Sequence, residues 1–223
     1  RLGLAHARGQ GHGLGGGGAL VVMVLVPGGM ATMGAEAGRP LDNHGDPKAT
    51  VIEQPVHTVE LGPFFLAKYE LTQAQWTRFT GSNPSAYVAG TKALGQLITP
   101  LDPVEQVLWD DAVRVLGRVG LTLPTEAQWE YGARAGTHTV FWTGNTAASL
   151  QGTANLADRS AKELGGPGSW VYETELSDGF VVHGPIGRFR PNPFGLHDMQ
   201  GNVWEWCLDK FGPYTLPTAP VTG

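Results

Sequence analysis

The sequence predicts a mixed α+β domain built from short strands, a few helices and much irregular chain. Three observations support this class. The 223 residues include 33 glycines and 16 prolines, which favour turns over long regular elements. Apolar runs in the first third of the chain have the composition of short strands. Two later segments begin with the side-chain pattern of a helix cap. The length suits one good-sized domain.

Composition narrows the range of functions. Hydrophobic residues make up 41% of the chain and charged residues 16%, which is typical of a globular rather than a disordered protein. The net charge of −5 provides no electrostatic footprint for nucleic acid, so we expect no nucleic-acid partner. Cys207 is the single cysteine, which excludes an internal disulfide framework. The 7 tryptophans supply buried area or the aromatic walls of a site.

The N-terminal region has two interpretations. Residues 1–18 are Gly-rich and basic, and we expect a flexible leader there. The apolar run at 19–26 is too short to span a membrane. It is either a buried first strand ended by Pro27, which we favour, or the hydrophobic region of a signal peptide with Ala35 or Ala37 near the cleavage site. The compartment therefore stays open, with the cytoplasm favoured and secretion as the alternative.

Two further strands are predicted before the first helix. Residues 54–61 alternate as a strand does, and Pro63 ends this segment. The aromatic and apolar residues 64–69 form a second strand that we expect to pair with the first. His57 is expected to be structural, because no second His or Cys lies at metal-ligand spacing from it.

Two helices follow. The sequence Thr-Gln-Ala-Gln at 72–75 is a capping box and predicts a helix that stops at 81–84. A second helix is predicted from about 110 to 119, with apolar residues at helical spacing. Asp110 and Asp111 lie in its first turn, where the macrodipole favours them, so a catalytic carboxylate pair is the weaker interpretation.

A third helix is predicted after Thr125, which acts as the N-cap, with Gln128 completing the box. Glu130 and Arg134 are spaced as an i,i+4 ion pair. Gly132 is expected to weaken this helix by up to about 1 kcal/mol relative to alanine.

The segment 201–206, Gly-Asn-Val-Trp-Glu-Trp, has the most chemically specific composition in the chain. In an extended conformation Trp204 and Trp206 share one face, and Glu205 lies on the other. A carboxylate between two large apolar rings is costly unless an arginine, a set of N–H donors or a metal ion pairs with it. The carbonyls of Gly201 and Val203 and the carboxylate of Glu205 occur at every second position. Oxygen ligands with this spacing suit a hard cation such as calcium.

These motifs, in their order along the chain, resemble the formylglycine-generating enzyme family, also called the sulfatase-modifying factor domain. The blocks that carry the resemblance are Val-Leu-Val-Pro-Gly-Gly with the Ala-Thr-Met-Gly after it (24–34), the strand region 55–69, Leu-Pro-Thr-Glu-Ala-Gln-Trp-Glu-Tyr (123–131), Ala-Asn-Leu-Ala-Asp with Asp-Gly-Phe (154–158 and 178–180), and Asp-Met-Gln-Gly-Asn-Val-Trp-Glu-Trp (198–206). The resemblance covers about residues 22–223. It implies a compact α+β fold related to C-type lectins, with an opening hairpin, short strands, two main helices and much irregular chain.

The resemblance also implies two structural calcium ions. One site would use Asn155, the Leu156 carbonyl, Asp178 and the Phe180 carbonyl. The other would use the carbonyls of Asp198, Gly201 and Val203 with the Glu205 carboxylate. Hard oxygen ligands agree with this expectation. The alternative is that Asp178 and Glu205 cap turns or pair with Arg188 or Arg190.

The resemblance implies a specific oxidation chemistry. Founding members of the family oxidise a cysteine of a sulfatase polypeptide to formylglycine, using oxygen and a copper(I) ion held by two cysteine thiolates, which copper(I) prefers. Those cysteines follow an Arg-Gly-Gly-Ser-Trp motif in the C-terminal part of the family. Residues 218–223 resemble the lead-in to that motif, so we expect this chain to lack the thiolate pair. Cys207 is no substitute and is expected to be a small apolar residue. Trp204 matches a tryptophan of the active-site pocket, with a core position as an equal alternative.

Three functional hypotheses follow. Residues 19–223 are a sulfatase-modifying-factor-like domain without its C-terminal segment, a fragment of a formylglycine-generating oxidase that binds copper only if the full protein carries that segment. Alternatively, the chain is the similar domain of an iron-dependent sulfoxide synthase. In the third hypothesis it is a non-catalytic, lectin-like ligand-binding module.

Overall fold

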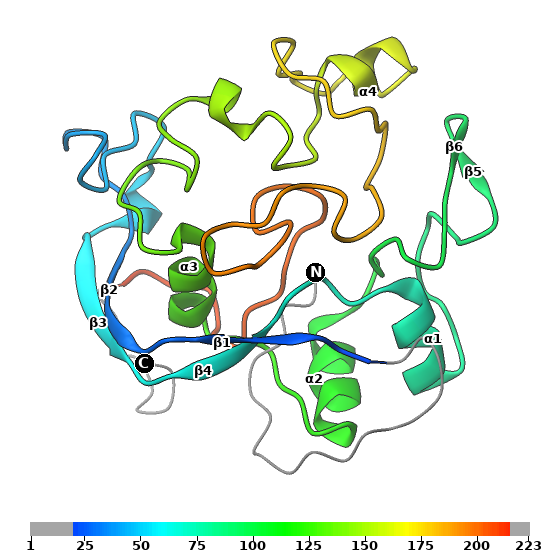
Figure 1. The fold of residues 1–223 in the computed structure, drawn as a ribbon, viewed down its shortest axis with the longest axis horizontal. Coiled ribbons are helices and arrows are strands. Elements are labelled where there is room, and N and C mark those ends of the chain that lie inside the picture. Colours follow the sequence, from blue (N-terminus) through cyan, green and yellow to red (C-terminus); the bar gives the residue numbers. More distant parts are fainter. Residues whose placement is uncertain (1–19, 215–223) are drawn as a thin grey trace.

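Four short strands form a bent antiparallel ribbon along one side of the molecule (Figure 1). β1 (Met23–Val26) pairs with β4 (Phe64–Ala67), and β2 (Gly29–Met33) pairs with β3 (His57–Leu61). The structure is a computed structural model that describes residues 20–214. The expected leader at 1–18 and the motif lead-in at 218–223 lie outside these residues. The strand interpretation of the first apolar run is confirmed for Met23–Val26.

The strand pairing differs from the sequence prediction. A hairpin within 24–34 and a pair between 54–61 and 64–69 were the natural expectations, and both pairings are wrong. One register continues through both halves of the ribbon instead: Val26 faces Phe64, and Gly29 faces Leu61. Prolines 27 and 63 cannot donate to the ladder, so they divide the ribbon into two sheets rather than reversing the chain.

Three helices lie where the sequence predicts them, and a fourth, short helix was not predicted. They are α1 (Gln73–Thr80), α2 (Trp109–Arg118), α3 (Glu126–Arg134) and the short α4 (Arg159–Glu163). Two 3-10 turns, η1 (Val51–Glu53) and η2 (Ala147–Leu150), and a small hairpin of β5 (Lys92–Ala93) with β6 (Gln96–Leu97) complete the elements of residues 20–214. The described chain thus has three helices of eight to ten residues, where the resemblance implies two main ones.

Both predicted capping boxes are confirmed. The Thr72 hydroxyl accepts the Gln75 N–H at 3.2 Å, and the Gln75 side chain accepts the Thr72 N–H at 2.9 Å. Thr125 and Gln128 make the same reciprocal pair at 3.2 and 3.0 Å. Gly81 ends the first of these helices with a left-handed φ of 81°. These two helices are therefore set by local sequence.

Two apolar clusters hold the elements together. The first gathers residues from β4, α1, α2 and the segments between them: Ala67, Leu71, Trp76, Val104, Val107, Ala112, Val115, Leu116 and Leu123. The second lies between the ribbon and α3 and includes Val26, Ala31, Met33, Leu61, Phe64, Leu66, Ala127, Ala133, Leu196 and Met199. Because Leu196 and Met199 belong to the second cluster, the base of the segment that leads to 201–206 is anchored in the core.

The chain after α3 is mostly irregular, as the glycine and proline content predicts. From Ala135 to Tyr214, η2 and α4 are the named elements, and loops cross the face of the molecule between α3 and α4 (Figure 1). None of the helices within residues 20–214 has the length and apolar character that crossing a membrane requires.

Candidate functional site

The segment 198–206 turns sharply instead of running extended. Asp198, Gly201 and Asn202 have φ values of 56°, 98° and 63°, a left-handed conformation that Gly, Asn and Asp adopt more readily than other residues. Trp204 is 92% exposed and Trp206 41% exposed. The core alternative for Trp204 is therefore wrong, and neither tryptophan ring is buried.

Asn202 ties this segment to two others. Its Oδ1 accepts the Gly184 N–H at 2.8 Å, and its Nδ2 donates to the Gly184 carbonyl at 3.2 Å. The same Nδ2 donates to Oε2 of Glu70 at 2.7 Å, and Glu70 is only 4% exposed. A side-chain amide offers both donors and an acceptor, so Asn202 satisfies partners that a carboxylate or an apolar residue would leave unpaired.

Gly201 allows a close approach between two loops. A Cβ at this position would lie 2.1 Å from the carbonyl oxygen of Asn155. That oxygen accepts the Asn202 N–H at 2.9 Å. The structure therefore places the segment that holds one predicted calcium site directly against the segment that holds the other.

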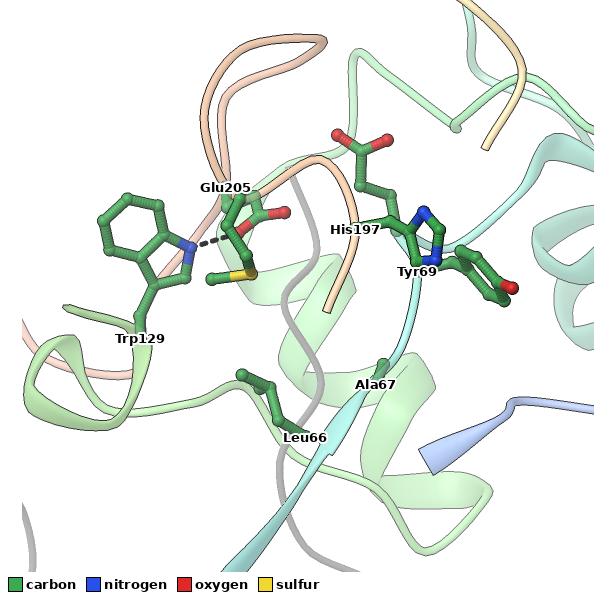
Figure 2. A pocket seen from close by; sticks show the side chains of 8 residues that line it. Leu66, Ala67, Tyr69, Trp129, His197 and Glu205 are labelled. Carbon is green, nitrogen blue, oxygen red and sulfur yellow. Dashed lines mark hydrogen bonds between the residues drawn. The ribbon is translucent and has the colours of Figure 1, made fainter. Parts of the chain in front are cut away.

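Glu205 faces inward, toward α3. Its Oε2 accepts a hydrogen bond from Nε1 of Trp129 (Figure 2). Glu205 and Glu70 both line a small cavity of about 10 Å³, together with Leu66, Ala67, Tyr69, Trp129, His197 and Met199. This volume is about that of one water molecule or ion. Burial lowers the pKa of His197 from its ordinary value, which favours the neutral imidazole in this cavity.

Asp178 lies at the centre of the other predicted cluster. Its Oδ2 accepts the Leu156 N–H at 2.9 Å, and its Oδ1 accepts the Phe180 N–H at 2.8 Å. Burial, together with a smaller contribution from the nearby Asp158, raises the pKa of Asp178 to about 6. The Asp178 N–H itself donates to Oδ2 of Asp158 at 2.5 Å. Asp178 thus caps two turns, and a cation here would favour its ionised form.

The structure brings some predicted ligands together and leaves others apart. Leu156, Asp178 and Phe180 are joined by the hydrogen bonds above, whereas the Asn155 Nδ2 donates to the Val182 carbonyl at 3.1 Å. Asp198 is 2% exposed and accepts the Gly187 N–H at 3.1 Å. Gly201 and Val203 line a larger groove that Glu205 also borders.

Neither alternative ion pair is present in the described part of the chain, where no salt bridge joins Asp178 or Glu205 to an arginine. Residues 20–214 also hold no group of three or more His, Cys, Asp and Glu side chains arranged for a metal. Backbone carbonyls and an amide supply most of the predicted ligands, so the calcium sites do not depend on such a group and stay a prediction.

Trp204 borders a wide groove of about 950 Å³. The residues that line the groove are Tyr87, Glu105, Gln106, Val107, Leu108, Asn155, Ala157, Trp170, Val181, Val182, His183, Gly201, Asn202, Val203, Trp204, Glu205 and Trp206. Three tryptophans and a tyrosine give it aromatic walls, and the lining contains no Lys or Arg. The predicted pocket role of Trp204 agrees with this position. A groove of this size and polarity suits a ligand with apolar groups.

Several residues of the site escape sequence reasoning. Glu70, from the segment between β4 and α1, and Trp129, from α3, reach the cavity although they are far from Glu205 in the chain. His183 lies in the groove and pairs with the buried Asp102. The only sequence signal was the presence of polar residues inside otherwise apolar blocks, which does not reveal which of them meet in space.

Comparisons with known proteins agree with the fold. A family model described as "Sulfatase-modifying factor enzyme 1-like domain" matches residues 19–222. The formylglycine-generating enzyme of Thermomonospora curvata is 28% identical over 230 positions, covering 84% of this chain and 71% of the relative. That of Streptomyces coelicolor is 28% identical over 241 positions, covering 89% and 72%.

Solved structures are similar as well. The structure of PvdO from Pseudomonas aeruginosa matches with a TM-score of 0.58 and 27% identity, over 84% of this chain and 70% of that one. Treponema denticola variable protein 1 matches with a TM-score of 0.64 and 23% identity, over 86% and 73%, which shows a shared fold alone. These likenesses confirm the predicted α+β architecture.

Proposed function

This chain belongs to the family of sulfatase-modifying factor enzyme 1-like domains, and we propose that it binds a sulfatase polypeptide and serves the conversion of a cysteine in that polypeptide to formylglycine. The observation that carries the proposal is the aromatic groove of about 950 Å³ beside the 201–206 segment. Relatives named formylglycine-generating enzymes, which align with 84% to 89% of the chain, supply the reaction class.

The groove residues would bind and orient the polypeptide. Trp170, Trp204 and Trp206 are each at least 39% exposed, so a peptide that covers them buries apolar area without displacing the core. Glu105 and Glu205 give the groove a negative edge. An extended segment with apolar side chains and no excess of acidic residues fits this lining.

The resemblance also implies a copper site. A copper ion would supply oxygen-dependent oxidation of the substrate thiol, and two thiolates would hold the ion. The residues of this sequence do not fit that site, because Cys207 is its single cysteine.

We also propose calcium as a structural ion. One site would use Asp178, whose burial disfavours its charge, with Asn155 and the carbonyls of Leu156 and Phe180. The other would use Glu205 with the carbonyls of Asp198, Gly201 and Val203, and Glu70 lines the same small cavity as Glu205. A cation would compensate buried negative charge there and stiffen irregular loops.

The cysteine count supports a second candidate, a non-catalytic ligand-binding module. In that case the groove binds its partner and no chemistry follows. The two candidates share the groove and differ only in whether the bound thiol is changed.

The proposal is tested with a synthetic peptide that spans the modified cysteine of a sulfatase. Titration should show binding, and Trp204→Ala should weaken it about tenfold, the effect of removing an aromatic anchor. Phe211→Ala is the matched control, because Phe211 is 86% exposed but does not line the groove. Equal affinities of the two variants would overturn the groove assignment.

Mass spectrometry of the peptide after incubation with the protein, copper and oxygen separates the two candidates. Replacement of the thiol by an aldehyde supports the oxidase. Binding with an unchanged peptide supports the ligand-binding module.

A further inference from the structure

A buried pair of titratable side chains, neither of them a predicted calcium ligand, meets the groove through its histidine. His183 is 5% exposed and Asp102 is 0% exposed. Nδ1 of His183 lies 3.0 Å from Oδ1 of Asp102. The second carboxylate oxygen accepts the Thr99 N–H at 2.9 Å and its hydroxyl at 2.7 Å. Because both oxygens of Asp102 accept, the carboxylate selects the tautomer with hydrogen on Nδ1 and leaves a lone pair on Nε2 of His183.

This Nε2 atom is buried and has no hydrogen-bond partner among residues 20–214. Leaving a buried acceptor unpaired costs roughly 1–3 kcal/mol, so a groove ligand that donates a hydrogen to Nε2 would be stabilised there. The Asp102 contact and the Gln96 side chain, which donates to the His183 carbonyl at 2.8 Å, hold the residue from both sides. The imidazole is therefore oriented in advance of any ligand.

Tyr87 packs against the imidazole at the groove. The two rings pack edge to face with centroids 5.6 Å apart, and both side chains line the groove. Tyr87 is 37% exposed. Because His183 itself lines the groove, a ligand that displaces this partly exposed ring would contact the imidazole.

We propose that His183, oriented by Asp102, accepts the proton of a thiol that binds in the groove and so holds that thiol as a thiolate. The inference rests on the proposed function, in which the bound polypeptide carries the cysteine to be modified. The S–H bond breaks, a bond forms between the proton and Nε2, and the electron pair stays on sulfur. The imidazolium that results faces the Asp102 carboxylate, which stabilises its charge.

The electrostatic surroundings agree with this direction of transfer. A free thiol has a pKa of about 8.5, and an adjacent imidazolium lowers it. The groups that face the ring from the packed elements are Asp102, Tyr87 and, along the groove, Glu105 and Glu205. Among the described residues of the lining, His183 is the single imidazole, and no Lys or Arg competes as a counter-ion. A thiolate in this groove would therefore depend on His183.

The experiment compares the sulfatase peptide with the same peptide carrying serine in place of cysteine. The ultraviolet absorbance of the thiolate is recorded at pH 7 for the complex. A blank that contains the protein alone removes the signal of Cys207. The wild-type complex should show thiolate and a preference for the cysteine peptide. His183→Gln should lower that preference about tenfold, equivalent to one unit of thiol pKa, and abolish the absorbance.

The serine peptide reports whether each variant is folded, since its affinity should be the same for the wild type, His183→Gln and Asp102→Asn. Asp102→Asn should reduce the thiolate signal while it keeps the imidazole. Thiolate absorbance retained in His183→Gln would overturn this inference and leave the proposed function standing. Binding of both peptides to the wild type without any thiolate signal would also overturn this inference and leave the proposed function standing. Failure of both peptides to bind the wild type would overturn the proposed function and this inference together.

Discussion

The backbone N–H of Asn202 donates to the carbonyl oxygen of Asn155 at 2.9 Å, and the absence of a side chain at Gly201 makes this contact possible. The two residues are far apart in the sequence. Asn155 is a predicted ligand of one calcium site, and Asn202 lies between Gly201 and Val203, two predicted ligands of the other. Any change at this contact should therefore affect both loops together.

Gly201→Ala should destabilise the fold through two effects. The left-handed φ of 98° costs an L-residue about 1–2 kcal/mol, and the new Cβ would lie 2.1 Å from the Asn155 oxygen. Gly195→Ala is the matched control, because Gly195 has a φ of 82° and open space around its Cβ position. Denaturant unfolding should show a clearly larger loss of free energy for Gly201→Ala. Equal losses would mean that the loops move apart freely.

Calcium should raise the melting temperature of the protein, and a chelator should lower it, because an ion that binds only the folded state stabilises that state. Asp178→Asn and Glu205→Gln should each reduce the calcium-dependent part of the shift. Asp42→Asn, a change at an exposed carboxylate, should leave it intact. Thermal melts with calcium or chelator measure this difference, and identical melts in the two conditions would exclude both sites.

Asn202→Asp should be among the most destabilising single changes of the site. The change removes the Nδ2 group that donates to Glu70 at 2.7 Å. It puts a second carboxylate in that place, next to the carboxylate of Glu70. We expect a loss of about 3 kcal/mol at neutral pH, typical of an uncompensated buried charge. Adding Glu70→Gln should recover part of it, because the new amide donates to the new carboxylate. No recovery in the double variant would place the effect elsewhere.

The sequence predicts local features of this fold well and long-range pairings poorly. The capping boxes at Thr72 and Thr125 depend on residues three positions apart, so the pattern alone locates them. The ribbon depends on whether the chain reverses or continues in the same direction at Pro27. Strand propensity does not indicate which strands then pair with each other. Within the site, Glu205 could be identified as a carboxylate in need of a partner, but its contact with Trp129 arises from packing across 76 residues.

Gly132 illustrates the same limit and gives a further prediction. Helix propensity alone predicts that alanine would stabilise α3, but a Cβ there would lie 2.9 Å from Leu66 and 3.3 Å from Leu196 in the packed core. Gly132→Ala should therefore destabilise by about 1 kcal/mol, since overpacking outweighs the gain in propensity. Gly117→Ala in α2, where nothing lies within 4 Å, should instead stabilise by about 0.5–1 kcal/mol. Chemical denaturation of both variants measures the signs, and a stabilised Gly132→Ala would show that Leu66 yields easily.

His44 should make the protein less stable in mild acid. Its Nε2 lies 2.9 Å from Nδ1 of His138, and burial together with the positive charge of Arg134 lowers the pKa of His44 to about 4. The unfolded chain binds a proton with a pKa near 6.5, so between about pH 6.5 and pH 4 the unfolded state holds more protons at this residue than the folded state. The stabilising contribution of neutral His44 is thus fully present above pH 6.5 and is lost as the pH falls toward 4. His44→Gln keeps a side chain capable of hydrogen bonding and cannot titrate. The free energy of unfolding of the wild type should fall relative to this variant as the pH is lowered from 7 to 4.5, and parallel profiles would show that His44 becomes protonated without cost.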